Sequence, residues 1–146
     1  MKVRDIMTAN VEAVGPETDL VTIARRMKDL NVGSLPVVEN DQLVGIITDR
    51  DIVIRGVAEG LSLQEEQVRN YLTPHPMTVT PDADAREAAE LMGREQIRRL
   101  PVVEGGRLVG MLAIGDVAVD VGKDRLVGDA LQQISEPAQP REEGVR

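Results

Sequence analysis

The chain of 146 residues contains no cysteine, no tryptophan and no phenylalanine, and its one tyrosine is Tyr71. Without cysteine there can be no disulfide, no zinc–thiolate site and no thiol catalysis, which also excludes a small secreted scaffold held by bridges. The near absence of aromatic side chains leaves little with which to stack nucleic-acid bases. The core must therefore be built from Val, Ile, Leu, Met and Ala.

Positive charge is also scarce, because 17 Lys and Arg residues face 25 Asp and Glu residues, for a formal net charge of -8. A nucleic-acid backbone or an anionic membrane surface attracts clustered cations, so we expect neither as a partner. No stretch without charged residues is long enough to span a bilayer, and no signal-peptide pattern follows Met1. These features predict a soluble, folded, cytoplasmic protein.

Motifs for catalysis are missing as well. The sequence has no Gly-x-x-x-x-Gly-Lys-Ser/Thr phosphate loop, no Gly-x-Gly-x-x-Gly and no serine in a nucleophile elbow. The single histidine, His75, lies between two prolines, and we interpret it as an exposed loop residue rather than a metal ligand. We therefore expect no catalytic residue, no metal site and no required cofactor. A hydrolase or transferase acting on nucleotides stays open as a third alternative, because counting the many carboxylates does not exclude a catalytic pair.

An internal duplication is the strongest feature that is present. A shift of 65 residues aligns positions 3–54 with 68–119 without a gap, and 17 of these 52 pairs are identical. Average composition would give roughly four identities by chance. Leu-Pro-Val-Val-Glu occurs at 35–39 and again at 100–104, and Leu-Val-Gly occurs at 43–45 and again at 108–110. The sequence is therefore a tandem repeat of one structural unit.

Each copy predicts the same order of elements. In the first copy, a short apolar strand at 11–14 precedes a helix at 20–30, whose apolar residues recur on one face. Two strands follow at 35–38 and 43–48, joined by Asn40-Asp41, and a last helix covers 49–58. The second copy has Gly105-Gly106 at the turn, and both dipeptides tolerate the positive φ of a two-residue hairpin. Its first strand and last helix are predicted at 77–80 and 115–121.

The predicted fold class is α+β, with two β-α-β-β-α repeats packed about a pseudo-two-fold axis. A single repeat is small for a core of its own, so the two are expected to bury their sheet faces against each other. We place the first repeat at residues 1–60 and the second at 61–122. Residues 123–146 are expected to form a helix over 124–134 and a loose tail.

The segment 45–51, Gly-Ile-Ile-Thr-Asp-Arg-Asp, is the best candidate for binding. A strand ends and a helix begins at Thr48, where unsatisfied N–H groups of the first helical turn favour an anion. Asp51 could accept hydrogen bonds from both hydroxyls of a ribose, as acidic residues do in dinucleotide sites. The same Thr-x-x-Asp spacing is also an ordinary capping box. The residues alone leave both roles open.

The second copy bears on this choice, because Ala113 replaces the threonine while Asp116 remains. A capping box would lack its hydroxyl at this position. The presence of Asp116 without that hydroxyl therefore favours a role for the aspartate other than capping. Arg98 and Arg99 precede the second Leu-Pro-Val-Val motif and point to opposite faces of the predicted strand. One of them could reach a cleft and bind a phosphate, and a solvated charge pair is the alternative.

The repeated Leu-Pro-Val-Val and Gly-x-x-Thr-x-x-Asp motifs closely resemble those of the CBS-domain family, named for cystathionine beta-synthase. Over residues 1–122 the chain resembles a stand-alone bacterial CBS pair, or Bateman module. The resemblance implies a regulatory sensor that binds AMP, ADP, ATP or S-adenosylmethionine in clefts between the repeats. It also implies a homodimer and a regulated partner protein, which the sequence does not identify.

Site roles follow from the resemblance, position by position. It implies that Asp51 and Asp116 each hold a ribose diol, and that Thr48 bonds ribose or phosphate while Ala113 cannot. The site at Thr48 and Asp51 would use Thr80 and the backbone near Arg98. The remaining candidates belong with Asp116, namely Gly15, Gly33 and Ser34, with Arg99 reaching phosphate.

The runner-up function is a ligand-free dimerisation or protein-interaction module, in which Thr48 and Asp51 serve only as a helix cap. Replacing Asp51 by Ala separates the two hypotheses. A sensor loses nucleotide affinity, whereas a simple cap costs about 1 kcal/mol of stability.

Overall fold

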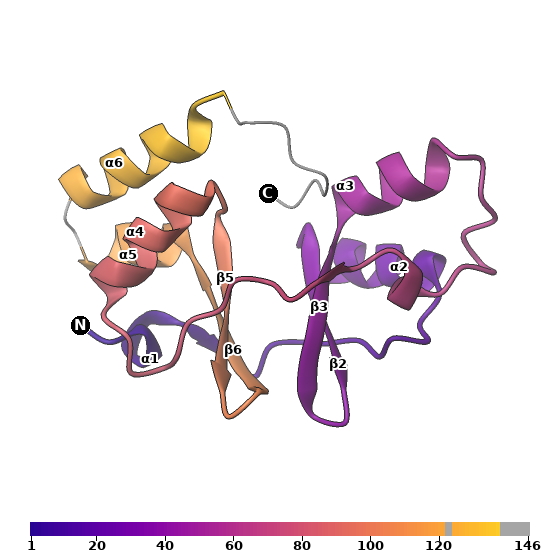
Figure 1. The fold of residues 1–146 in the computed structure, drawn as a ribbon, viewed down its shortest axis with the longest axis horizontal. Coiled ribbons are helices and arrows are strands. Elements are labelled where there is room, and N and C mark those ends of the chain that lie inside the picture. The colour runs from indigo at the N-terminus through magenta and orange to yellow at the C-terminus, as the bar shows by residue number, and fades with distance from the viewer. Residues whose placement is uncertain (122–123, 138–146) are drawn as a thin grey trace. The chain divides into compact units, whose positions relative to one another are not determined.

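The structure is a computed structural model that describes residues 1–121 and 124–137 of the chain. Its residues divide into two compact units (Figure 1). The repeat-1 unit contains Glu12–Pro76, and the repeat-2 unit contains Met1–Val11 together with the described residues from Met77 onward. Both units mix helices and strands, which confirms the α+β class and the tandem arrangement.

In the repeat-1 unit a β-hairpin packs with a helix (Figure 1). Helix α2 (Leu20–Leu30) begins at Asp19, whose carboxylate accepts the Thr22 N–H at 3.0 Å. Strands β2 (Ser34–Glu39) and β3 (Gln42–Thr48) pair antiparallel, and β3 leads directly into helix α3 (Asp49–Asp51). The remaining elements are the π-helix η1 (Ile52–Val57), the 3-10 turn η2 (Val68–Asn70) and strand β4 (Thr73–Pro74), which pairs with β3.

The repeat-2 unit repeats this plan and adds a helix. Helix α4 (Ala85–Glu95) precedes the antiparallel strands β5 (Arg99–Glu104) and β6 (Arg107–Ala113). Helix α5 (Ile114–Val121) follows β6 directly, and helix α6 (Asp124–Ser135) comes next. The N-terminal residues form helix α1 (Val3–Ile6) and strand β1 (Thr8–Ala9), which pairs with β6.

The predicted hairpins and long helices are confirmed. A helical segment also follows each hairpin as predicted, but after the first hairpin only Asp49–Asp51 is α-helical and Ile52–Val57 is a π-helix. Asn40 and Asp41 have φ values of 52° and 65°, and Gly105 and Gly106 have 59° and 82°, as the two-residue turn requires. Helix α6 ends one residue beyond the predicted position 134. The predicted loose tail, apart from its start, lies outside the described residues.

The predicted first strand of each copy is wrong in extent. Val14 forms a single parallel bridge with Val37, and Val79 forms the equivalent bridge with Val102. Pro16 and Pro81 follow two residues later and have no N–H to donate, so the pairing cannot continue as a ladder. Each strand is thus reduced to one paired residue.

The opening segments of the two sequence copies pack in a way that the duplication did not predict. Val3 and Val68 are equivalent in the repeat and both are fully buried. The Val3 N–H donates to the Ala83 carbonyl at 2.9 Å in the repeat-2 unit, and the Val68 N–H donates to the Thr18 carbonyl at 2.8 Å in the repeat-1 unit. The segment that opens each copy in the sequence therefore completes the unit that holds the rest of the other copy.

Each unit has its own apolar core, built from the aliphatic residues that the composition required. The fully buried members of the repeat-1 core include Leu20, Ile23 and Ile47, and those of the repeat-2 core include Met92, Leu100 and Leu112. Within the described residues, no helix is long and apolar enough to cross a membrane.

Candidate functional site

The junction between β3 and α3 in the repeat-1 unit carries a complete capping box. The Asp51 N–H donates to Thr48 Oγ1 at 3.0 Å, and the Thr48 N–H donates to Asp51 Oδ2 at 3.0 Å. Thr48 is 6% exposed and Asp51 is 3% exposed, and among the described residues they are the only polar or charged ones that are buried. The two side chains therefore hold each other and the first helical turn in one geometry.

The entrance of β2 lies beside this junction. Ser34 is paired with Thr48 in the hairpin register, and the Asp49 N–H donates to the Gly33 carbonyl at 2.9 Å. A Cβ at Gly33 would lie 3.0 Å from an oxygen of the Asp49 carboxylate, so glycine leaves this approach open. Asp49 is an acidic neighbour that the sequence analysis did not single out, because it occupies a variable position of the Thr-x-x-Asp motif.

Gly15 lies apart from these residues within the same unit. It follows Val14, whose bridge is to Val37, three residues beyond Ser34 along β2. Its carbonyl accepts the Thr18 N–H at 3.2 Å. The repeat-1 unit thus brings together Gly33, Ser34, Thr48 and Asp51, and it separates Gly15 from them.

The equivalent junction of the repeat-2 unit has one of the two hydrogen bonds of the capping box, the one that the aspartate accepts. Asp116 Oδ2 accepts the Ala113 N–H at 2.8 Å, and Asp116 is partly exposed rather than buried. The aspartate therefore has a local structural reason to be present without the threonine. Its carboxylate is more accessible to a ligand than that of Asp51.

Two exposed arginines and one exposed threonine accompany Asp116 in this unit. The Arg98 carbonyl accepts the Ile114 N–H at 2.9 Å, and Arg99 is paired with Ala113 in the hairpin register. Thr80 follows Val79, which bridges Val102, so it occupies the place that Gly15 has in the other unit. The predicted sites combine residues of both units, and that combination stays a prediction.

The clearest electrostatic effects lie away from both junctions. The hydroxyl and N–H of Thr22 hold the pKa of the Asp19 carboxyl below its ordinary value at the start of α2. Hydrogen bonds from Arg4, at 3.0 Å and 2.5 Å, do the same for the pKa of Asp82. Both carboxylates stabilise local structure, Asp19 as a helix cap and Asp82 as an anchor for the N-terminal segment.

The sequences of the two repeats identify the family of this chain. The family model described as "CBS domain" matches residues 3–56 and 68–123. The chain belongs to the CBS-domain family. The uncharacterized protein YlbB of Bacillus subtilis (strain 168) is 38% identical over 145 residues, which cover 98% of this chain and 97% of that relative.

Two solved CBS structures are similar to this chain. Hypoxic Response Protein I, solved with two coordinated zinc ions, has 36% identity and a TM-score of 0.76, covering 82% of this chain and 98% of that one. CBSX2 in complex with AMP has 27% identity and a TM-score of 0.74, covering 85% and 98%. In the part of this chain that the structure describes, no group of three or more His, Cys, Asp or Glu side chains could hold a metal ion.

Proposed function

We propose that this CBS pair is a regulatory module that binds an adenosine-containing nucleotide and has no catalytic activity of its own. One observation carries the proposal: Asp51 and Asp116 occupy the same position at equivalent strand–helix junctions. A CBS structure of similar fold was solved with AMP, which supports this class of ligand.

The geometry of each junction suits a ribose. Asp51 and Asp116 each use Oδ2 to accept a backbone N–H, which restricts the orientation of the carboxylate before any ligand arrives. A carboxylate oriented in this way can accept hydrogen bonds from the two hydroxyls of a ribose diol. Binding to a fixed group costs less conformational entropy than binding to a mobile one.

Arginine favours a phosphate-bearing ligand over a neutral adenosine. Arg98 and Arg99 are exposed at the entrance of β5, on the same hairpin end as Ala113 and Asp116. A guanidinium binds phosphate oxygens in a bidentate manner and keeps its charge at all physiological pH values. AMP, ADP or ATP therefore fits this end better than adenosine, and S-adenosylmethionine is the alternative within the same class.

We also propose that the module self-associates as a homodimer through the helices that follow the hairpins. Ile54 and Val119 are equivalent in the repeat, and they are 47% and 83% exposed. Val53 and Val57 extend this apolar surface on η1, where they are 53% and 56% exposed. Exposed apolar side chains gathered on one helical segment, as they are on η1, are typical of an association surface.

A ligand-free interaction module is the second candidate, and it is favoured by the complete box at Thr48 and Asp51. There each side chain already satisfies a backbone N–H of the other residue, so a cap alone accounts for the pair. This candidate predicts an unchanged thermal midpoint with every nucleotide.

A thermal-shift panel tests the proposal with AMP, ADP, ATP, S-adenosylmethionine and adenosine, with GTP as the control ligand. A ligand at about one hundred times its dissociation constant stabilises by roughly 2.7 kcal/mol. For a chain of this size we expect the midpoint to rise by about 5–10 °C. A flat response to the whole panel, on folded protein, would contradict the proposal.

Asparagine variants separate ligand binding from capping, because the amide oxygen of Asn can still accept the backbone N–H. We expect Asp51→Asn and Asp116→Asn each to reduce the shift by removing a carboxylate that accepts the ribose diol. Matched controls are Asp19→Asn and Asp84→Asn, at the starts of α2 and α4, which change a helix cap in each unit away from the junctions. Equal effects in all four variants would assign the aspartates a structural role only.

A further inference from the structure

In the part of the chain that the structure describes, helix α6 is an addition to the second repeat alone, and it packs closely along α4 (Figure 1). Ala89 of α4 and Ala130 of α6 are buried between the two helices. A Cβ added to Gly93 would lie 3.3 Å from the Cα of Ala130 and would overlap the side-chain oxygen of Gln133. Small residues therefore allow a helix contact that a larger side chain at Gly93 would prevent.

The equivalent helix of the first repeat cannot hold such a partner. Ala24 and Lys28 of α2 correspond to Ala89 and Gly93 in the 65-residue register, and both are exposed. Lys28 puts a long charged side chain where Gly93 has none. The docking surface for α6 is thus a specific feature of α4.

One residue joins the ends of both helices. Gln96 ends α4 in the left-handed conformation, with φ at 56°, and its backbone N–H donates to the carbonyls of Met92 and Gly93. Its side-chain Nε2 donates to the carbonyls of Gln133 and Glu136, at 3.0 Å and 3.1 Å, where α6 ends. Asparagine is the usual non-glycine residue in this conformation, and the equivalent residue in repeat 1 is Asn31. Glutamine supplies the longer reach that the contact with α6 uses.

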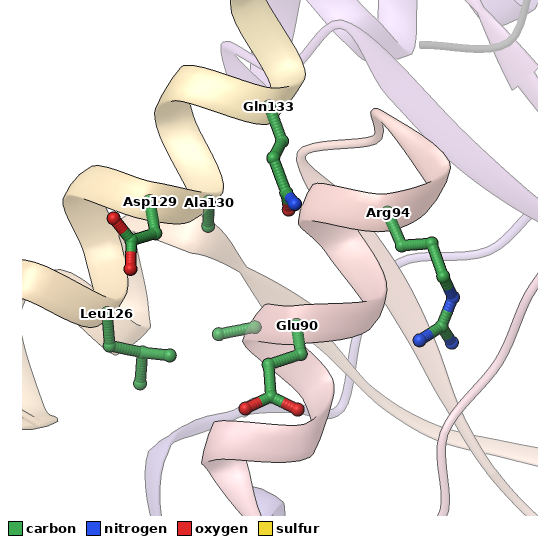
Figure 2. Close-up of a pocket in the computed structure, with 7 residues that line it drawn as sticks. Glu90, Arg94, Leu126, Asp129, Ala130 and Gln133 are labelled. Carbon is green, nitrogen blue, oxygen red and sulfur yellow. The ribbon is translucent and has the colours of Figure 1, made fainter.

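The contact between α4 and α6 leaves a cavity of about 330 Å³ beside it. Figure 2 shows the residues that line it, Glu90 and Arg94 on α4 and Leu126, Asp129 and Gln133 on α6, with the Arg94 side chain pointing away from α6. The lining mixes polar side chains with the apolar Leu126, and the buried Ala89 and Ala130 complete it. The helix pair is therefore held by a close contact of small residues, by Leu126 and Val127 of α6 packed against the repeat-2 core, and by Gln96 at its end.

Gln96 also lies close in sequence to residues of the candidate ligand site. Two residues further on, the Arg98 carbonyl accepts the N–H of Ile114, the first residue of α5. Asp116 lies in the first turn of that helix and holds the Ala113 N–H. Hydrogen bonds at Gln96 and at Arg98, joined by the short backbone segment between them, thus link the end of α6 to the junction at Asp116.

We propose that α6 is a latch whose docking on α4 is coupled to nucleotide binding at the Asp116 junction, with Gln96 as the positioning residue between them. The inference rests on the proposed nucleotide-binding function. Coupling between two sites is reciprocal. If docking of α6 changes the affinity for ligand by some factor, ligand binding at the junction changes the docking equilibrium of α6 by the same factor. The latch would give this CBS pair an output element for a partner protein.

The test is hydrogen exchange of the α6 amides in the full chain, with and without AMP, combined with AMP titrations of two variants. Gln96→Asn keeps the left-handed end of α4 and removes the reach to α6. Gly93→Ala raises the helix propensity of α4 while crowding Ala130. The controls are Asn31→Gln, in the first repeat, and Gly128→Ala, where an added Cβ meets nothing within 4 Å.

We expect both variants to speed exchange in α6 at least about fivefold and to change the AMP dissociation constant by a similar factor, as coupled sites do. The controls should change neither quantity. Faster exchange with an unchanged dissociation constant would overturn the coupling, and unchanged exchange would overturn the latch. Absence of AMP binding to the wild-type chain would instead remove the proposed function, and the coupling with it.

Discussion

Thr48 and Ala113 occupy equivalent positions and form a natural pair of experiments on single residues. Thr48→Ala removes the hydroxyl that accepts the Asp51 N–H inside a buried box. We expect it to lower the free energy of unfolding by about 1 kcal/mol, because loss of an N-cap costs this much. Ala113→Thr should restore the box next to Asp116 and raise stability by a smaller amount. Urea unfolding monitored by circular dichroism measures both changes.

Changes in stability opposite to these would show that Thr48 does not stabilise the chain as a helix cap. If Thr48→Ala is neutral in stability but weakens AMP binding, the hydroxyl acts on the ligand. If Ala113→Thr destabilises the chain, the second junction does not have room for the box.

The ion pair between Arg4 and Asp82 predicts a pH dependence. Arg4 lowers the pKa of Asp82, so the folded state favours the charged carboxylate. That contribution is present above the unfolded pKa, about 3.9, and is lost as the pH falls through the lower folded pKa. We expect wild type to be more stable than Asp82→Asn at about pH 6, and the difference to shrink toward about pH 2.5.

Thermal midpoints across this pH range measure the effect. Asp5→Asn serves as a comparison within the same segment, since Asp5 accepts the backbone N–H of Lys2. A difference that grows as the pH falls would contradict the assigned sign.

At the scale of elements, Gly45 and Gly110 explain how a neighbouring short strand can pair closely with one strand of each hairpin. A Cβ at Gly45 would lie 2.6 Å from the Thr73 carbonyl oxygen, and one at Gly110 would lie 2.8 Å from that of Thr8. These oxygens belong to β4 and β1, which pair at the two glycines. Backbone atoms cannot move aside as a flexible side chain can.

We therefore expect Gly45→Ala and Gly110→Ala each to destabilise the chain by about 1–3 kcal/mol, which is typical of overpacking. Gly115→Ala is the control, because nothing lies within 4 Å of its added Cβ. Chemical unfolding measures all three variants. Loss of stability in the control alone would refute this account of the glycines.

The elements that sequence predicts well are those specified by local chemistry. Asn40-Asp41 and Gly105-Gly106 identify the two hairpin turns, and apolar spacing identifies α2 and α4. The first strands were over-predicted, because apolar character does not show that only Val14 and Val79 find a partner. Helix α1 was missed, since four residues carry too little periodicity to be recognised.

At the scale of the whole molecule, the duplication predicted two related units but not which unit the opening segments complete. Each opening segment packs in the unit of the other copy through tertiary contacts such as those of Val3 and Val68. These two residues are identical in the repeat, so their sequence does not show which unit each one joins. Much of the candidate site could be predicted, because Thr48, Asp51 and Asp116 lie at the expected junctions. The hydrogen bond from Ala113 to Asp116 was not foreseen, since periodicity does not report on backbone partners.

Self-association is the prediction that belongs to this scale. Ile54→Glu places a charge on the apolar surface of η1 and should convert the proposed dimer to a monomer, as sedimentation velocity would show. Leu131→Glu on α6 is the control, because Leu131 is 43% exposed and Ile54 is 47% exposed. A wild-type chain that sediments as a monomer would contradict the dimer.

The central claim is that Asp116 and Asp51 hold an adenosine nucleotide, and calorimetric titration of the full chain with AMP tests it most directly. The account predicts saturable binding to wild type, weakened in Asp51→Asn and in Asp116→Asn, and unchanged in Asp84→Asn. Binding of AMP that persists unaltered in both junction variants would contradict it, as would the absence of binding to a folded wild-type chain.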